Sequence, residues 1–274
     1  MEDDILTIYV LCDELLNALA MPEDPQATLS MAQVMTVPLT AARFFHGNIN
    51  HARVFLDAYD YIHPILSESR LNRRIHGIPD RVWEALGHIL RATFQAMNPD
   101  QEYCLDSFPV PVCDNIRIQR CLLYQGEEYR GYIASKRRYF YGLRVHMIVT
   151  ASGQPVEFIL RPGSESDVAV FKDFNFDLPL KARCYADKMS NDYAQEALLQ
   201  EALGIQFEPL RKRNSTKETS YLNEHYKATI RKRIETSFSQ ITNFFPTSIH
   251  AVTARGFELK VICFIFAFSI SCLI

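Results

Sequence analysis

The stretch Glu102-Tyr-Cys-Leu-Asp-Ser-Phe-Pro-Val-Pro-Val-Cys113 places an acidic residue at the end of a short apolar run. Residues 103–105 have the composition of a strand, and Asp106 follows them directly. Pro109 and Pro111 lack the N–H group that a central strand donates, so we expect the strand to end near Asp106. Sheets of α/β proteins present reactive groups where their strands end. Asp106 is therefore a candidate site residue.

Two further acids occur in comparable positions later in the chain. Asp187 ends the strand-like run 181–186, and Glu235 belongs to a basic helical segment. Three separated carboxylates without a Cys or His ligand motif favour a hard cation such as Mg²⁺, with Mn²⁺ as a substitute. A pair of such ions can activate a water or a 3′-hydroxyl and stabilise the leaving oxygen of a phosphodiester. Lys188, next to Asp187, is suited to binding a phosphate.

Each acid also has a purely structural interpretation. Asp106 could cap the turn that follows it, Asp187 could cap a helix that begins near residue 191, and Glu235 could pair with Arg231. Other carboxylates close to these positions are candidates as well: Asp114, Asp167, Asp173 and Asp192. Spacing alone supports metal-dependent phosphoryl transfer as a hypothesis and leaves these alternatives open.

The composition describes a globular chain with clustered positive charge. Its 274 residues are 48% hydrophobic and 22% charged, which fits one main domain and an accessory one. The net charge of −3 gives no overall attraction to nucleic acid, but local clusters can still bind a polyanion. The clusters lie before the strand-like stretch that starts at residue 139, after residue 210 and on the last basic helix, and consist of Lys136, Arg137, Arg138, Arg211, Lys212, Arg213, Arg231, Lys232 and Arg233.

Cysteine usage and hydropathy predict an intracellular protein without a membrane segment. Seven cysteines, an odd number with no C-x-x-C pair, indicate reduced and mostly buried thiols. No basic segment precedes an apolar core at the N-terminus, so we expect no secretory signal. The apolar run 261–274 is shorter than the roughly twenty residues that a spanning helix needs, which favours a buried terminal element.

Hydrophobic periodicity divides the chain into a helical part and a mixed part. Helical spacing predicts helices at 5–19, 29–45, 51–66 and 79–97, and so an all-helical domain over residues 1–97. Its arginines could contact DNA or form a solvated surface. Alternation then predicts a strand over 139–149 and a hairpin partner over 155–160. A strand over 181–186, a helix over 192–203, a strand over 205–210 and the helix with Glu235 complete a mixed α/β order.

Several long motifs occur in an order that resembles the transposases of the bacterial insertion sequence 982 family. They include Leu105-Asp-Ser-Phe-Pro-Val-Pro-Val-Cys113, Pro162-Gly-Ser-Glu-Ser-Asp167 and Arg231-Lys-Arg-Ile-Glu-Thr236. Shorter matches cover 115–118, 131–136, 139–146, 155–158, 191–193, 211–215, 249–253 and 256–261. The resemblance extends over most of the chain from residue 60 onward.

That resemblance implies a ribonuclease-H-like catalytic domain over 98–274, a mixed sheet flanked by helices, behind a helical domain over 1–97 that helps bind DNA. It implies that Asp106, Asp187 and Glu235 form a DDE triad holding two Mg²⁺ ions. The enzyme would cut and join strands through attack by water and then by a 3′-hydroxyl. Its partners would be transposon-end and target DNA, and it would form a homo-oligomer on DNA in the bacterial cytoplasm, associated with the nucleoid.

One departure from the family pattern occurs beside the second acid. The family usually follows its Asp-Lys with a small residue and Tyr, whereas this chain reads Asp187-Lys-Met-Ser190. The sequence is therefore also compatible with a catalytically inactive DNA-binding remnant of such a transposase. A nuclease that cuts without joining would use the same three acids.

Overall fold

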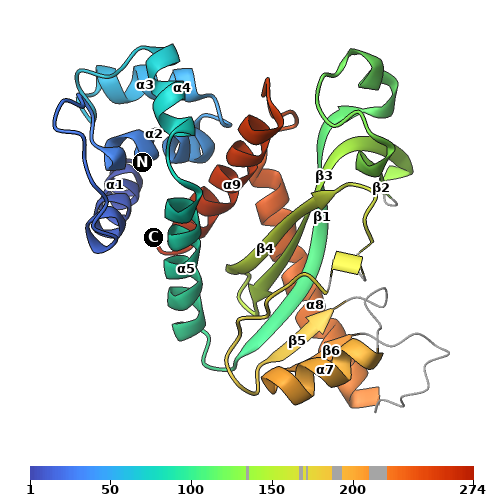
Figure 1. Cartoon of the computed structure of the whole chain (residues 1–274). Coiled ribbons are helices and arrows are strands. Elements are labelled where there is room, and N and C mark those ends of the chain that lie inside the picture. The colour runs from blue at the N-terminus through green and yellow to red at the C-terminus, as the bar shows by residue number, and fades with distance from the viewer. Residues whose placement is uncertain (134–135, 167–168, 171, 187–192, 210–220) are drawn as a thin grey trace. The chain divides into compact units, whose positions relative to one another are not determined.

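The computed structural model describes residues 1–133, 136–166, 169–170, 172–186, 193–209 and 221–274 (Figure 1). Contacts within the chain divide it into two compact units. One, the helical unit, contains Met1–Leu90 together with Asn243–Ile274. The other, the sheet unit, contains Arg91–Thr242.

The helical unit is built from helices, several of which have side-chain caps at their N-termini. It contains α1 (Glu2–Ala18), α2 (Met31–Phe44), α3 (Ile49–Ala58), α4 (Glu68–His76), most of α5 (Asp80–Ala96) and α9 (Ala254–Ser271). Ser30 and Gln33 form a capping box at the start of α2, and the Thr253 hydroxyl accepts the Gly256 N–H at the start of α9. The helices predicted over 5–19, 29–45 and 79–97 are confirmed by α1, α2 and α5.

The helix predicted over 51–66 is wrong in its second half. α3 ends at Ala58, and Asp60 takes a left-handed backbone conformation that a helix cannot contain. The short helix α4 was missed by the periodicity analysis. It buries only Leu71 and Ile75, four residues apart, and its other positions are strongly polar.

The apolar C-terminal run forms a buried helix, as predicted. α9 packs against α2 and α1 and buries most of its residues from Val261 to Ile270. No helix in the described part of the chain combines the length and the hydropathy that crossing a membrane requires. All seven cysteines are free, and four of them are buried, which confirms the interpretation as thiols. Burial raises the pKa of the Cys263 thiol to about 12.

The sheet unit contains a mixed sheet that six strands form among the described residues. They are β1 (Glu102–Asp114), β2 (Arg130–Ile133), β3 (Arg138–Thr150), β4 (Pro155–Pro162), β5 (Arg183–Ala186) and β6 (Gln206–Pro209). The order is β2-β3-β1-β5-β6, and β4 also pairs with β3. β1 is antiparallel to β3 and parallel to β5, which is parallel to β6. The predicted mixed α/β order and the β3–β4 hairpin are confirmed.

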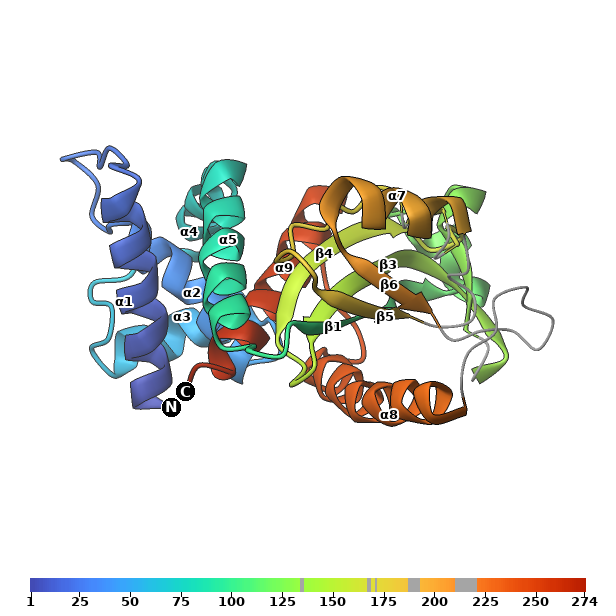
Figure 2. The same ribbon diagram turned by 90° about the horizontal axis from the view of Figure 1, so that it is seen from below.

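Two helices flank this sheet on opposite faces, as Figure 2 shows. They are α7 (Tyr193–Leu203) and α8 (Tyr221–Phe244). α7 contacts β6, and α8 contacts β1 through aromatic rings. The sheet is therefore buried on both faces near its centre, and β3 is buried at every position from Val145 to Thr150.

The prediction that the first strand ends near Asp106 is wrong. β1 continues through Pro109 and Pro111 and stays paired with β3 as far as Asp114. Among the described residues, β5 pairs with β1 from Glu102 to Leu105, and the later part of β1 pairs with β3 alone. The two prolines occupy alternate positions and direct their nitrogens to the same side, away from β3, where no described strand requires a donor from them. Proline is tolerated at such positions.

Candidate active site

Asp106 lies in β1 just after the stretch whose pairing with β5 the structure describes. Leu105 pairs with Ala186, which is the last pair between β1 and β5 among the described residues. In the sequence, Asp106 directly follows Leu105, and Asp187 directly follows Ala186. The Asp106 side chain is half-buried, and its Oδ1 accepts the Ser107 backbone N–H at 2.8 Å. Asp187 and Lys188 lie outside the described residues.

The face of β1 that carries Asp106 is covered by α8. Asp106 and Phe108 are two residues apart on a strand, so their side chains share one face. The ring of Phe108 meets the ring of Phe238 in α8, with centroids 6.2 Å apart and planes inclined by 71°. Both rings are buried. This contact ties α8 to the part of the strand that follows Asp106.

Glu235 lies one helical turn before that contact. Residues three apart on a helix are neighbours on its surface, so Glu235 and Phe238 project from the same side of α8. Glu235 is exposed, whereas Phe238 is buried against the sheet. Two of the three predicted acids thus come from elements that are joined directly by packing. The alternative pairing of Glu235 with Arg231 stays open, because the Arg231 side chain is outside the described part.

The competing acids that the structure describes are held in ion pairs. The Asp114 carboxylate forms an ion pair with the Arg138 guanidinium at a nitrogen–oxygen distance of 3.3 Å. The Asp173 carboxylate forms one with the Arg161 guanidinium at 2.6 Å. Both pairs are at least a third exposed, which is typical of solvated surface interactions. Asp167 and Asp192 lie outside the described residues. The structure thus gives a surface role to two of the four alternatives.

The donor atoms of Asp106 and Glu235 suit a hard cation, since both offer only carboxylate oxygens. Among the residues that the structure describes, no group of three or more His, Cys, Asp and Glu could hold a metal ion. That search does not include Asp187. The chemistry of the two described acids fits Mg²⁺, and a complete ligand set requires the third.

Arg144 is a polar residue of β3, bonded to the residue after Asp106, that the sequence analysis did not select. Its Nη1 donates to the Ser107 hydroxyl at 3.3 Å, and its Nη2 donates to the Tyr132 carbonyl at 3.3 Å. Arg144 therefore links β3 to both β1 and β2. The sequence signal was present, because an arginine interrupts an otherwise apolar strand.

The basic clusters are described only in part. Lys136, Arg137 and Arg138 are exposed beside the start of β3, and Lys232 is exposed on α8. Arg211, Lys212 and Arg213 lie outside the described residues, as do the side chains of Arg231 and Arg233. The exposure of the first cluster is compatible with a role in binding phosphates.

The helical unit contains a cavity of about 730 Å³, lined in part by His46, His51, His76 and His250. Lys260 also lines it and donates from Nζ to the His250 carbonyl at 2.5 Å. Burial lowers the pKa of this lysine. The cavity has no counterpart among the sequence predictions.

Comparison with known proteins identifies the family. Residues 98–271 match the family described as the transposase DDE domain. The chain belongs to the transposase DDE domain family. No curated protein matches the sequence. Among solved structures, this DDE domain protein is similar to the piggyBac transposase in a cryo-EM structure of its synaptic complex with hairpin DNA, at 10% identity and a TM-score of 0.45. The similarity covers 100% of this chain and 66% of the piggyBac chain, so the protein spans just under two thirds of that length.

Proposed function

We propose that the protein is a DNA transposase of the insertion sequence 982 type that cuts and joins strands at the ends of its element. Asp106, Asp187 and Glu235 are its catalytic metal ligands, on a ribonuclease-H-like domain over 98–274. The observation that carries this proposal is the pairing of Leu105 with Ala186, because each of these residues immediately precedes one of the two aspartates. The Phe108–Phe238 contact supports the assignment of Glu235.

The protein's own residues orient the reacting groups. Asp106 belongs to a strand paired with β3, and the Ser107 N–H bond fixes the direction of its carboxylate. Glu235 is carried by a helix that packs on the same face of the sheet. Two bound Mg²⁺ ions would supply activation of the attacking hydroxyl and stabilisation of the leaving oxygen. Lys188 holds a phosphate beside the site.

DNA binding is assigned to the basic clusters and to the helical domain over residues 1–97. The clusters are Lys136 to Arg138, Arg211 to Arg213 and Arg231 to Arg233. Contacts to phosphates set the position of a duplex without reading its sequence. The substrates in this proposal are transposon-end and target DNA, with the protein acting as a homo-oligomer on DNA.

The test is Mg²⁺-dependent cleavage of DNA that contains the segments flanking the gene. The wild type is expected to cut and to form strand-transfer products, while Asp106→Asn, Asp187→Asn and Glu235→Gln bind DNA without cutting. Asp173→Asn is the matched control, because it removes the same charge from a surface ion pair and is expected to cut normally.

Three other outcomes would contradict parts of the proposal. Cutting without strand transfer would identify a nuclease. DNA binding without any cutting, with Mg²⁺ or Mn²⁺, would identify an inactive remnant. Equal cutting by the wild type and Asp187→Asn would show that Asp187 is not a ligand.

A further inference from the structure

Two exposed tyrosines face each other on neighbouring strands of the sheet unit. Tyr132 of β2 pairs with Tyr139 of β3, and their ring centroids are 4.9 Å apart. The residues are 45% and 48% exposed, respectively. Aromatic rings of this size are usually buried or used in binding, since their exposure forfeits apolar burial. The pair is therefore a candidate contact surface.

A cation extends the tyrosine pair into a stack of three groups. The Arg130 guanidinium lies 4.4 Å from the centroid of the Tyr139 ring, within the range of a cation–π interaction. The Arg130 Nη1 also lies 3.5 Å from the Glu127 carboxylate. The β2 backbone is held by Arg144, which donates to the Tyr132 carbonyl. These contacts hold the tyrosine rings in place before any ligand arrives.

The surroundings of this stack are basic. Lys136, Arg137 and Arg138 are exposed between the two tyrosines in the sequence, and Arg138 forms a surface ion pair with Asp114. Lysine is depleted in protein–protein interfaces, whereas aromatic rings combined with lysine and arginine are typical of surfaces that bind single-stranded nucleic acid. The charge around the rings thus favours a polyanion over another protein.

The stack lies on the same face of the sheet as the candidate catalytic acid. Asp106 pairs with Met147 of β3, so the two side chains share a face. Tyr139 is eight residues before Met147 on the same strand, and an even spacing keeps it on that face. At about 3.3 Å per residue, the two positions are about 26 Å apart along β3. A DNA strand that enters the site can therefore reach the tyrosines.

We propose that Tyr132 and Tyr139 stack on unpaired bases of the DNA, while Arg130 and the neighbouring exposed cations hold the adjacent phosphates. The inference rests on the proposed function and adds that the substrate includes an unpaired or opened segment of the strand. Stacking on aromatic rings tolerates any base, because every base has a π-face. The pair therefore recognises the opened state of the DNA rather than its sequence.

The experiment measures binding of the full chain to three DNA probes of one sequence. They are a single strand, a duplex with two internal unpaired bases and a fully paired duplex, each carrying 2-aminopurine. The protein variants are Tyr132→Ala with Tyr139→Ala, and Tyr132→Phe with Tyr139→Phe. The alanine pair is expected to bind the two unpaired probes at least tenfold more weakly, because each stacked base contributes substantially to affinity. The phenylalanine pair keeps both rings and is expected to bind like the wild type.

Affinity for the fully paired duplex and the salt dependence of binding distinguish base stacking from phosphate binding by charged residues. The alanine pair is expected to bind the paired duplex within about twofold of the wild type, with an unchanged salt slope, since no phosphate contact is lost. Equal weakening on all three probes, or no weakening on any, would overturn the proposal. If the alanine double variant formed a smaller oligomer than the wild type in the absence of DNA, the two rings would belong to an interface between copies of the chain. If the wild type cuts no DNA but shows the tyrosine-dependent preference, the proposed function fails and this inference stands.

Discussion

The ring of Phe238 in α8 meets the ring of Phe108 in β1 at an angle of 71°, with 6.2 Å between the ring centroids. Because Phe108 shares a face with Asp106 and Phe238 shares a side with Glu235, this contact couples two candidate catalytic acids. Phe238→Ala is expected to lower the free energy of unfolding by about 3 kcal/mol, the usual cost of removing a buried ring. It should also lower DNA cleavage by the protein that remains folded, because Glu235 loses the contact that orients its helix. Urea titration and single-turnover cleavage measure the two effects.

Phe174→Ala is the matched control for this prediction. Phe174 is as buried as Phe238 and packs against Phe176 in the same unit. A similar loss of stability is expected, with cleavage retained by the folded protein. Equal cleavage by both variants would show that the Phe108–Phe238 contact does not orient Glu235.

Gly142 permits the irregular pairing between β1 and β3. Its φ is +154°, and an added Cβ would lie 2.5 Å from the Val110 carbonyl oxygen. Gly142→Ala is therefore expected to destabilise the protein by about 1–3 kcal/mol, through overpacking against backbone atoms. Gly87→Ala in α5 is the opposite case, since its Cβ would make ordinary contacts at 3.5 Å with Phe266. Alanine should stabilise that helix by up to about 1 kcal/mol. Thermal unfolding of both variants tests the contrast.

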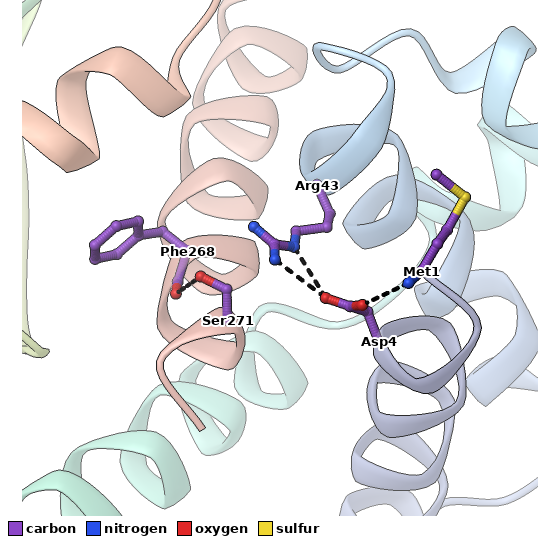
Figure 3. A network of polar contacts seen from close by, with 5 residues as sticks. All are labelled: Met1, Asp4, Arg43, Phe268 and Ser271. Carbon is purple, nitrogen blue, oxygen red and sulfur yellow. Dashed lines mark hydrogen bonds and ion pairs between the residues drawn. The ribbon is translucent and has the colours of Figure 1, made fainter. Parts of the chain in front are cut away.

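Asp4 joins α1 to α2 through an ion pair with Arg43, at 3.1 Å, and also accepts the N-terminal ammonium at 3.0 Å (Figure 3). Burial alone would raise the pKa of Asp4, but hydrogen bonds and charge from these two cations outweigh it and lower the pKa. A carboxylate whose pKa is lower in the folded state than in the unfolded state stabilises the fold at pH values above its unfolded pKa of about 3.9. This stabilisation is lost as the pH falls through the pKa of the folded state.

Asp4→Asn is accordingly expected to cost about 1 kcal/mol at pH 7, as partly buried ion pairs do. The difference from the wild type should shrink as the pH falls below about 4, where the wild-type carboxylate becomes protonated. Asp3→Asn removes an exposed charge from the same helical turn and controls for the helix dipole. A cost that does not change with pH would contradict the role of the ion pair.

The cluster Arg211 to Arg213 is expected to bind phosphates. Replacing Arg211, Lys212 and Arg213 by Ala should lower both the affinity for duplex DNA and the magnitude of the salt slope, because each phosphate contact releases counterions. Gel-shift titrations at several salt concentrations measure both quantities. An unchanged slope would reassign this cluster to an ordinary solvated surface.

Met189 and Ser190 occupy the positions where the insertion sequence 982 pattern, which the sequence resembles, has a small residue and Tyr. The neighbouring Asp187 and Lys188 are retained, so we expect the wild type to cut DNA in the presence of Mg²⁺. The double change Met189→Ala and Ser190→Tyr should cut at least as well and serves as the positive control. If only the restored variant cuts, the site assignment is right and this copy has lost activity.

Local sequence patterns determined most of the secondary structure. The spacing of Ile5, Ile8, Cys12 and Leu15 specifies α1, and strict alternation specifies β3, because both periods depend only on the order of residues along the chain. The same analysis selected Asp106 and Glu235, whose elements proved to be in contact. The assignment of Asp187 depends on sequence adjacency and remains a prediction.

Only the tertiary structure decided how far β1 extends and which distant segments come into contact. Pro109 and Pro111 suggested the end of a strand, yet β1 continues, because β3 pairs with it on one side and no described strand pairs with the prolines on the other, where proline is tolerated. The packing of Phe238 on Phe108 joins residues 130 positions apart, and no local pattern encodes such a contact. The stack of Arg130, Tyr139 and Tyr132 likewise depends on strand register. Local order sets the conformation of each segment, whereas contacts between distant segments exist only once burial of apolar surface has brought those segments together.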